Sequence, residues 1–375
     1  MGANIQKIAP PRKAGRLALR RERCYTGRTR EGSAMISFAS DYAEGAHPRL
    51  LERLAATNLE SAPGYGADKW SERARQKIRQ ACACPEAEVF FLMGGTQTNQ
   101  VVIDALLPPY AGVLAAATGH VCVHEAGAIE YTGHKVLPLP SHDGKLDVAD
   151  LRQWIADFHA DANHEHMVFP GMAYISHPSE YGTLYTRAEL AALYAACTEY
   201  GIPLFLDGAR LGYALACPES DVRLPDVAAL TDAFSIGGTK VGALCGEAVV
   251  FPRGGAPAHF LTRIKQHGAL LAKGRLLGVQ FDALFSDGLY VELGRNAIRH
   301  AATIREALRA RGYRLYGTSP TNQIFLVLED ARYAALRQRV EMSFWERVDA
   351  GHVLVRLATS WATTDAAVQA LLAVL

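Results

Sequence analysis

Residues 186–210 read TRAELAALYAACTEYGIPLFLDGAR and contain one complete repeat of a helix followed by a strand. Thr186 and Glu189 have the spacing of a capping box, which predicts a helix over residues 186–200. Gly201 then marks the end of this helix. The next run, IPLFL, is short and apolar throughout, which is typical of a strand that is covered on both faces.

The same alternation of short apolar runs and helical segments extends through the middle of the chain. The earlier segments are EAEVFFLM (86–93), TQTNQVVIDALL (96–107), GVLAAATGHVCVHEAGAIEYTG (112–133) and MVFPGMAYIS (167–176). Strands separated by helices of about a dozen residues indicate an α/β fold. We therefore expect a large domain with a mainly parallel sheet and helices on both faces.

The pattern changes after about residue 255. Long helical stretches there precede two apolar runs; these segments are HFLTRIKQHGALLAKGRLLGVQFDALF (259–285), LGRNAIRHAATIREALRARG (293–312), NQIFLVLE (322–329) and HVLVRLAT (352–359). We predict a large domain over residues 61–254 and a smaller α+β domain over residues 255–375, which residues 35–60 join.

The composition excludes several classes of function. The 375 residues carry 39 basic and 38 acidic side chains, so no net field favours nucleic acid or an acidic membrane as a partner. No apolar run is long enough to span a bilayer. The seven cysteines do not have the usual zinc spacing, which indicates a reducing cytoplasm and no metal site.

Residues 1–34 differ from the rest of the chain because they are rich in arginine and lysine and their first acid is Glu22. An Arg-rich, acid-poor start can mark a mitochondrial transit peptide. We favour a flexible basic extension, or an addition upstream of a start near Met35.

Three expected strand ends carry unusual residues, and ligands of open parallel sheets bind at such ends. The first is Gly94-Gly95-Thr96, between a strand and a helix. Glycines allow an anion to approach the backbone, and the N-terminus of a helix presents free N–H groups. Taken alone, this segment suits either a phosphate site or an ordinary strand-to-helix turn, and it lacks the spacing of a dinucleotide or nucleoside triphosphate loop.

The second and third ends carry Asp207 and Lys240. A carboxylate at the end of the apolar strand IPLFL needs a cationic partner. Either Arg210 pairs with it, or Asp207 meets a cationic ring nitrogen and leaves Arg210 free for a substrate carboxylate. In the stretch SIGGTK, Lys240 follows an apolar segment and two glycines, and desolvation there favours the neutral, nucleophilic amine. A phosphate site, a buried carboxylate and such a lysine together are what a pyridoxal phosphate site requires.

The motifs of the chain resemble those of the threonine aldolase and β-eliminating lyase family of fold-type I pyridoxal phosphate enzymes. The similar segments are MISFASDY (35–42), PGYGAD (63–68), GGTQTN (94–99), GHVCVHEAGA (119–128), LDGAR (206–210) and VRLATS (355–360). The resemblance implies an aspartate aminotransferase-like fold for everything after residue 34.

The resemblance also implies roles for eight residues. Those that would hold or activate the cofactor are Gly95, Thr96, His120, Asp207 and Lys240. Those that would bind the substrate carboxylate are Ser40, Arg210 and Arg356. In this scheme Lys240 forms the Schiff base, Asp207 keeps the ring nitrogen protonated, and His120 stacks on the ring and transfers the proton of the substrate hydroxyl.

The expected activity is the cleavage of β-hydroxy amino acids, such as threonine or allo-threonine, to glycine and an aldehyde. The alternatives are a β-eliminating lyase that yields pyruvate and ammonia, and a non-catalytic binder of the same fold. The resemblance further implies a homodimer or homotetramer with Tyr65 contributing across subunits, Arg275 at a dimer interface, and His166 as a second active-site histidine.

Overall fold

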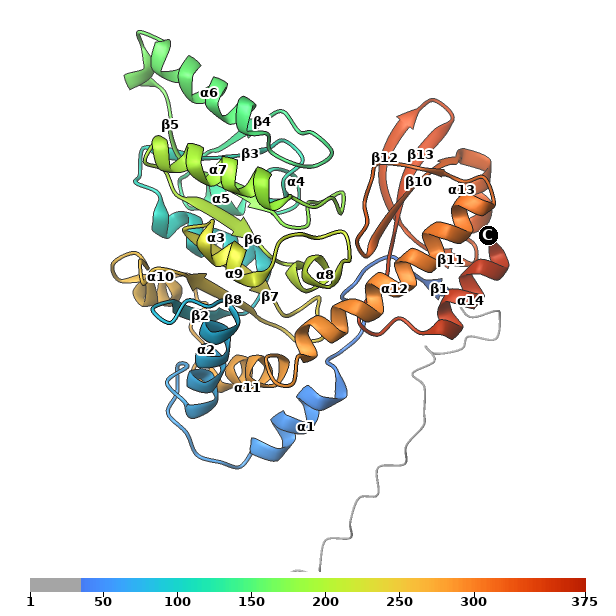
Figure 1. Cartoon of the computed structure of the whole chain (residues 1–375), viewed down its shortest axis with the longest axis horizontal. Coiled ribbons are helices and arrows are strands. Elements are labelled where there is room, and N and C mark those ends of the chain that lie inside the picture. Colours follow the sequence, from blue (N-terminus) through green and yellow to red (C-terminus); the bar gives the residue numbers. More distant parts are fainter. Residues whose placement is uncertain (1–34) are drawn as a thin grey trace, which may run out of the picture. The chain divides into compact units, whose positions relative to one another are not determined.

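The computed structural model describes residues 35–375, and Ile36–Leu375 form one compact unit (Figure 1). The predicted basic extension, residues 1–34, lies outside the described residues. No helix in the described part of the chain combines the length and apolar character that crossing a membrane requires. Because the structure groups Ile36–Leu375 together, the predicted domain boundaries stay predictions.

The centre of the unit is a seven-stranded sheet that is mainly parallel, as predicted. Its strands, in spatial order, are β2 (Glu88–Leu92), β8 (Glu247–Phe251), β7 (Ala233–Gly237), β6 (Leu204–Asp207), β5 (Phe169–Ser176), β3 (Ala111–Ala116) and β4 (Val136–Leu139). Only β8 runs antiparallel to its neighbours β2 and β7.

Helices occupy both faces of this sheet (Figure 1). The helices of the described chain are α1 (Pro48–Thr57), α2 (Lys69–Ala81), α3 (Gly95–Leu106), α4 (His120–Val123), α5 (Ala128–Tyr131), α6 (Val148–Ala160), η1 (His164–His166), α7 (Arg187–Glu199), α8 (Leu211–Ala216), α9 (Leu224–Ala229), α10 (Phe260–Gln266), α11 (Arg275–Leu284), α12 (Leu289–Ala310), α13 (Asp330–Leu336) and α14 (Asp365–Val374).

The strands send alternate side chains to the two faces. In β6, Leu204 and Leu206 belong to one apolar cluster, together with side chains of α6 and α7, whereas Phe205 belongs to a second cluster with α3 and α10. Burial on both sides explains why the sequence of this strand is apolar throughout rather than alternating.

Two helix predictions have different outcomes. The helix predicted over 186–200 is α7, and the capping box at Thr186 is present with both of its hydrogen bonds. The single long stretch predicted over 259–285 is wrong, because the chain forms α10 and α11 with a break between them. Gly268 lies in that break with φ +67°, a left-handed conformation that a helix interior does not accommodate.

A second, four-stranded antiparallel sheet contains the two apolar runs predicted near the C-terminus. Its strands are β12 (Ser343–Asp349), β13 (His352–Ala358), β10 (Gln323–Glu329) and β9 (Arg314–Leu315). Strand β1 (Ile36–Ser37) pairs in parallel with β11 (Val340–Glu341), and β11 comes directly before β12 in the sequence. The long helix α12 connects the two cores, because its first half packs in the cluster of the large sheet and its second half packs against β10 and β13.

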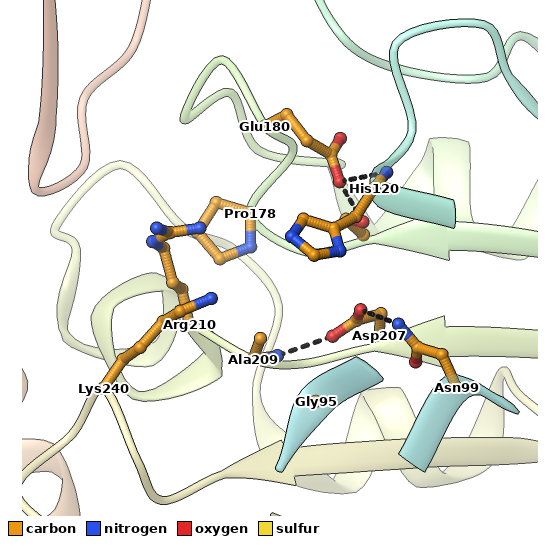
Figure 2. A pocket seen from close by; sticks show the side chains of 10 residues that line it. Gly95, Asn99, His120, Pro178, Glu180, Asp207, Ala209, Arg210 and Lys240 are labelled. Carbon is orange, nitrogen blue, oxygen red and sulfur yellow. Dashed lines mark hydrogen bonds between the residues drawn. The ribbon is translucent and has the colours of Figure 1, made fainter. Parts of the chain in front are cut away.

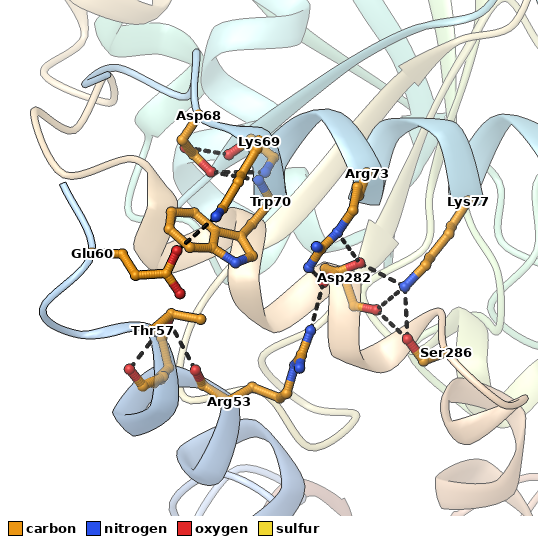
Figure 3. A network of polar contacts seen from close by, with 12 residues as sticks. Arg53, Thr57, Glu60, Asp68, Lys69, Trp70, Arg73, Lys77, Asp282 and Ser286 are labelled. Atoms are coloured by element: carbon orange, nitrogen blue, oxygen red, sulfur yellow. Dashed lines mark hydrogen bonds and ion pairs between the residues drawn. The ribbon is translucent and has the colours of Figure 1, made fainter. Parts of the chain in front are cut away.

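A network of charges ties α1, α2 and α11 together (Figure 3). The side chain of Asp282 on α11 is only 1% exposed and pairs with Arg53, Arg73 and Lys77, the last with Nζ 2.6 Å from Oδ1. Burial alone would raise the pKa of Asp282, but hydrogen bonds from Arg73 and Lys77 outweigh it and lower the pKa below 3.8. The ionised form of Asp282 therefore stabilises the folded state.

We expect Asp282→Asn to lower the free energy of unfolding by about 2–4 kcal/mol at pH 7, because it leaves several cations without their buried partner. Since the folded pKa of Asp282 is lowered, this contribution is present above the unfolded pKa and disappears as the pH falls through the folded pKa. Urea unfolding at pH 7 and near pH 3 measures both effects. The difference in the free energy of unfolding between the variant and the wild type should be smaller near pH 3.

The matched control is Asp287→Asn, the same chemical change at a side chain that is 78% exposed and pairs only with Arg49. It should change the free energy of unfolding by no more than about 0.5 kcal/mol. Equal losses in the two variants would contradict the structural importance of the Asp282 network.

Candidate active site

The carboxyl ends of β5, β6 and β7 lie side by side at one edge of the large sheet. Ser176, the last residue of β5, lies opposite Asp207, the last residue of β6. Lys240 is in the turn that follows β7, and it lines the same cavity as Asp207 and Gly95 (Figure 2). The structure therefore brings together the three strand ends that the sequence singled out.

Two glycines allow the ends of β6 and β7 to approach each other. A Cβ on Gly208 would lie 2.0 Å from the carbonyl oxygen of Ser235, and one on Gly237 would lie 2.2 Å from the carbonyl oxygen of Ala209. The backbone N–H of Gly237 donates to the carbonyl of Gly208 at 2.9 Å. This close approach keeps Asp207 and Lys240 at one cavity.

Asp207 is a buried carboxylate with three hydrogen-bond donors. The hydroxyl of Tyr174 and the side-chain amide of Asn99 donate to Oδ2 at 2.7 and 2.8 Å, and the backbone N–H of Ala209 donates to Oδ1 at 2.8 Å. Burial would raise the pKa of Asp207, but the charge of His120 and these donors outweigh it and lower the pKa. Asp207 therefore presents a negative charge to the cavity.

His120 faces this carboxylate from the other side of the cavity (Figure 2). Its Nδ1 lies 2.7 Å from Oε1 of Glu125, a fully buried carboxylate that also accepts from Asn99 at 2.7 Å. Its backbone N–H donates to Oε1 of Glu180 at 2.9 Å, and the same oxygen accepts from Ser176 at 2.6 Å. Burial raises the pKa of Glu180. Hydrogen bonds to the backbone N–H and to the ring Nδ1 of His120 thus hold its imidazole in place.

Lys240 sits in a tight turn, because the N–H of Gly238 donates to the carbonyl of Gly246 at 3.0 Å and the N–H of Val241 donates back to Gly238 at 2.9 Å. Burial, followed by the charge of Arg210, lowers the pKa of Lys240. A lowered pKa increases the share of the neutral amine, which is the nucleophilic form. The isolated lysine of SIGGTK is thus a cavity-lining amine rather than a surface cation.

Arg210 does not pair with Asp207, and it is not free either. Its Nε and Nη2 donate to the two carboxylate oxygens of Asp41 at 2.7 and 3.1 Å. Asp41 is fully buried, and the side-chain amide of Asn322 also donates to it at 2.9 Å. The alternative in which Arg210 pairs with Asp207 is therefore wrong, and Asp41 orients the guanidinium at the cavity wall, where its binding of a substrate carboxylate stays a prediction.

Arg356, from β13, lines an adjoining outer cavity together with Arg210 and Lys240. Its guanidinium donates to the side-chain carbonyl of Gln323 at 2.9 Å and to the backbone carbonyl of Ala39 at 3.2 Å, and it lies 5.3 Å from the ring centre of Trp345. Burial lowers its pKa to about 10, so it stays charged at neutral pH. Ser40 lies between the segments that contact the two arginines, but it is not among the residues that line the cavity.

The site consists of two adjoining cavities. The inner one lies between His120 and Asp207, and the outer one has a volume of about 520 Å³. Four residues line both: His120, Glu180, Arg210 and Lys240. Aromatic and imidazole side chains form much of the outer wall; these include Tyr42, His124, Tyr181, Phe344 and Trp345. The inner cavity is therefore lined largely by polar side chains, and aromatic side chains line much of the wider outer cavity.

The residues present fit pyridoxal phosphate. The ionised Asp207, only 5% exposed, suits a protonated ring nitrogen, and Lys240 reaches the same space with its amine. A Cβ on Gly94 or Gly95 would meet no heavy atom within 4 Å, so open space lies before the N-terminus of α3. A phosphate can approach the free N–H groups there. Thr96, in the first turn, is exposed and does not line the inner cavity.

Three other predicted residues lie elsewhere. His166 belongs to η1, which precedes β5, and lines neither cavity. Tyr65 is 52% exposed and has a positive φ of 58°, and its N–H donates to Ala272. Arg275 packs within its own chain, with its guanidinium 4.1 Å from the ring centre of Trp70. The roles of Tyr65 and Arg275 between subunits stay predictions.

Sequence reasoning missed five residues that support the site. They are Asp41, Asn99, Glu125, Tyr174 and Glu180. Asp41, Asn99 and Glu125 lie within the quoted family motifs and could have been singled out there. Tyr174 lies on β5 and Glu180 follows that strand, and only the fold shows that Tyr174 donates to Asp207 and that Glu180 lines the cavity.

Comparisons with known proteins agree with this geometry. The sequence profile of the family described as Beta-eliminating lyase matches residues 37–340. A low specificity L-threonine aldolase of a Pseudomonas species is 32% identical over 343 residues, which cover 90% of this chain and 96% of that protein. Another, from Saccharomyces cerevisiae, is 27% identical over 309 residues, which cover 79% of this chain and 76% of that protein.

Solved structures of related proteins have a similar fold. Leishmania major threonine aldolase superposes with a TM-score of 0.87 at 43% identity, covering 90% of this chain and 98% of that one. An aspartate aminotransferase of Thermus thermophilus superposes with a TM-score of 0.66 at 16% identity over 90% of each chain, which shows a shared fold alone. The fold is therefore of the aspartate aminotransferase type, fold type I.

We expect Gly237→Ala to destabilise the protein by about 2–3 kcal/mol or more, because the new Cβ would collide with the backbone of Ala209 and force β6 and β7 apart. The same separation should weaken binding of pyridoxal phosphate. Thermal unfolding and titration with the cofactor measure the two effects. Gly255→Ala, at a glycine with no atom within 4 Å of an added Cβ, is the control and should match the wild type in both.

Proposed function

Because this chain belongs to the family of β-eliminating lyases and is a pyridoxal phosphate-dependent carbon–carbon lyase, we propose that it cleaves β-hydroxy amino acids to glycine and an aldehyde. Threonine and allo-threonine are the proposed substrates. The observation that carries the proposal is the cavity in which Lys240 and Asp207 meet, with two arginines at its outer side.

Each residue of the inner cavity has a role in this proposal. Lys240 would attach to the cofactor's aldehyde carbon, Asp207 would hold the proton on the ring nitrogen, and the imidazole of His120 would cover one face of the ring. Gly95 and Thr96, at the N-terminus of α3, would hold the phosphate. When bound, pyridoxal phosphate supplies an electron sink for the pair that remains on Cα after a bond there breaks.

The outer cavity would hold the substrate. Arg210 and Arg356 present two guanidinium groups to it and would bind the α-carboxylate, with Ser40 close to both. Holding the carboxylate fixes which bond of Cα stands perpendicular to the cofactor ring. Breaking the Cα–Cβ bond then requires removal of the proton from the β-hydroxyl group, which a group with an available lone pair must accept.

We expect Lys240→Ala to abolish the absorbance band near the visible edge that the wild type forms with pyridoxal phosphate, because the amine that joins the cofactor is gone. Lys135→Ala, at an exposed lysine outside both cavities, should keep the band. The absorbance spectrum of each variant is recorded after loading with pyridoxal phosphate and removal of the unbound cofactor by dialysis. Retention of the band by Lys240→Ala would exclude this lysine as the attachment point and would favour the binder of the same fold.

The two catalytic alternatives differ in their products. We expect the wild type to release glycine and acetaldehyde from threonine and allo-threonine. A β-eliminating lyase would instead release pyruvate and ammonia from β-chloroalanine. Parallel assays of the three substrates separate the two reactions. If only β-chloroalanine reacts, the proposed aldol cleavage is wrong.

The proposal includes a cytoplasmic homodimer or homotetramer. Leu51, Leu59 and Tyr65 expose 47%, 96% and 52% of their surface around α1 and the loop that follows it. Exposed apolar side chains along one stretch of the chain support a subunit interface there. Sedimentation equilibrium gives the oligomeric state, and a monomer at micromolar concentration would contradict this part of the proposal.

A further inference from the structure

The short helix α4 and its C-cap residue each present a histidine to the site, His120 and His124. The backbone N–H of His124 donates to the carbonyl of His120 at 2.9 Å, so the two residues are one turn apart. Their ring centres are 5.6 Å apart. Both line the outer cavity beside Lys240, whereas only His120 also lines the inner one. The second imidazole is therefore the one that lies entirely on the substrate side.

The ring of His120 already has a fixed position. Its Nδ1 is hydrogen-bonded to the buried Glu125, and its backbone N–H is held by Glu180. Its face is turned toward the space above Asp207 and Ala209, where the cofactor ring would lie (Figure 2). A ring that stacks on the cofactor directs its nitrogens along the plane of the stack, so it is poorly oriented toward a hydroxyl group on Cβ.

The ring of His124 has no such constraint. Within residues 35–375, no hydrogen bond engages either of its ring nitrogens, and its main contact is edge-on with Trp345 at 5.7 Å between ring centres. Partial burial lowers the pKa of His124 below 6.5, and the charges of His120, Arg356 and Arg210 lower it further. At neutral pH the ring is therefore mainly uncharged, and its unprotonated nitrogen has a lone pair that can accept a proton.

The other titratable groups of the outer cavity are less suitable as bases. Glu180 has an oxygen that already accepts two hydrogen bonds, and burial raises its pKa. Burial also raises the pKa of Tyr181, which keeps the phenol protonated. Lys240, Arg210 and Arg356 serve the cofactor and the carboxylate; the remaining groups are Tyr42 and Glu346 at the exposed rim.

We propose that His124 is a catalytic residue that accepts the proton of the substrate's β-hydroxyl group; this inference rests on the proposed function. The O–H bond breaks and its proton bonds to a ring nitrogen of His124, while the oxygen lone pair forms the C=O bond of the aldehyde. The Cα–Cβ bond breaks, and its electron pair stays with Cα. A proton from solvent then adds to Cα to give glycine, and the imidazolium, whose proton loss the nearby guanidinium charges favour, returns its proton to solvent.

The test compares His124→Ala with the wild type, both loaded with pyridoxal phosphate. We expect kcat for threonine cleavage to fall about 100-fold or more, which is typical of the loss of a general base. Glycine has no β-hydroxyl group, so exchange of its Cα hydrogen for deuterium should stay within about threefold of the wild type. The absorbance titration that measures cofactor affinity should be unchanged, and added imidazole should restore cleavage at least about tenfold.

Two further variants complete the design. His124→Asn keeps a planar polar side chain in case the alanine variant does not fold, and it should show the same loss of cleavage and the same retained exchange. His142→Ala removes an exposed histidine that pairs with Asp150 outside both cavities, and it should behave as the wild type. In the protein without cofactor, NMR signals of the imidazole that disappear in His124→Asn should titrate below pH 6.5.

The outcomes separate the two proposals. Cleavage by His124→Ala within threefold of the wild type, or an equal loss of cleavage and glycine exchange, would overturn the role of His124 and leave the proposed function standing. A wild type that exchanges the Cα hydrogen of glycine but releases no aldehyde from any β-hydroxy amino acid would overturn both.

Discussion

The site depends on a carboxylate that is removed from water. Asp207 ends an apolar strand, and its charge persists there only because donors from three different elements surround it: Tyr174 of β5, Asn99 of α3 and the backbone N–H of Ala209. An ionised group without such donors would be far too costly at this depth. The three donors in turn fix how α3 and the ends of β5 and β6 lie relative to one another.

The same principle links residues that are distant in the sequence. Arg210, in the middle of the chain, pairs with Asp41 near the start of the described residues, and Asp41 also accepts from Asn322 in the C-terminal part. Arg356 donates to the carbonyl of Ala39, two residues before that aspartate. Two buried cations at one cavity repel each other, and the carboxylate between them offsets that repulsion. The carboxylate-binding end of the site thus needs all three parts of the chain.

The histidines at the start and at the C-cap of α4 show how position alone can separate the chemistry of identical side chains. His120 lies against buried Glu125 and is held in the inner cavity. His124, one turn further on, meets two guanidinium charges and an aromatic edge instead. Partial burial and then the neighbouring charges lower the pKa of His124 and so favour the neutral imidazole, which is the form that accepts protons.

The sequence by itself determined the alternation of helices and strands, the mainly parallel sheet, the strand ends that carry Asp207 and Lys240, and the family. Local propensity, capping and burial on both faces are short-range properties that the order of residues encodes directly, as the capping box at Thr186 shows. The family profile and the relatives confirm the cofactor that the combined motifs indicated.

Only the tertiary structure decided the partners of the charged groups. From the sequence, Arg210 was expected either to pair with Asp207 or to bind a substrate carboxylate. In the structure its ion-pair partner is Asp41, 169 positions away. The structure also showed that His166 lies outside the cavities and His124 inside one of them. The reason is physical: a buried charge is satisfied by whichever group the packing of the strands and helices brings within about 3 Å, and the separation of two residues along the chain does not determine that distance.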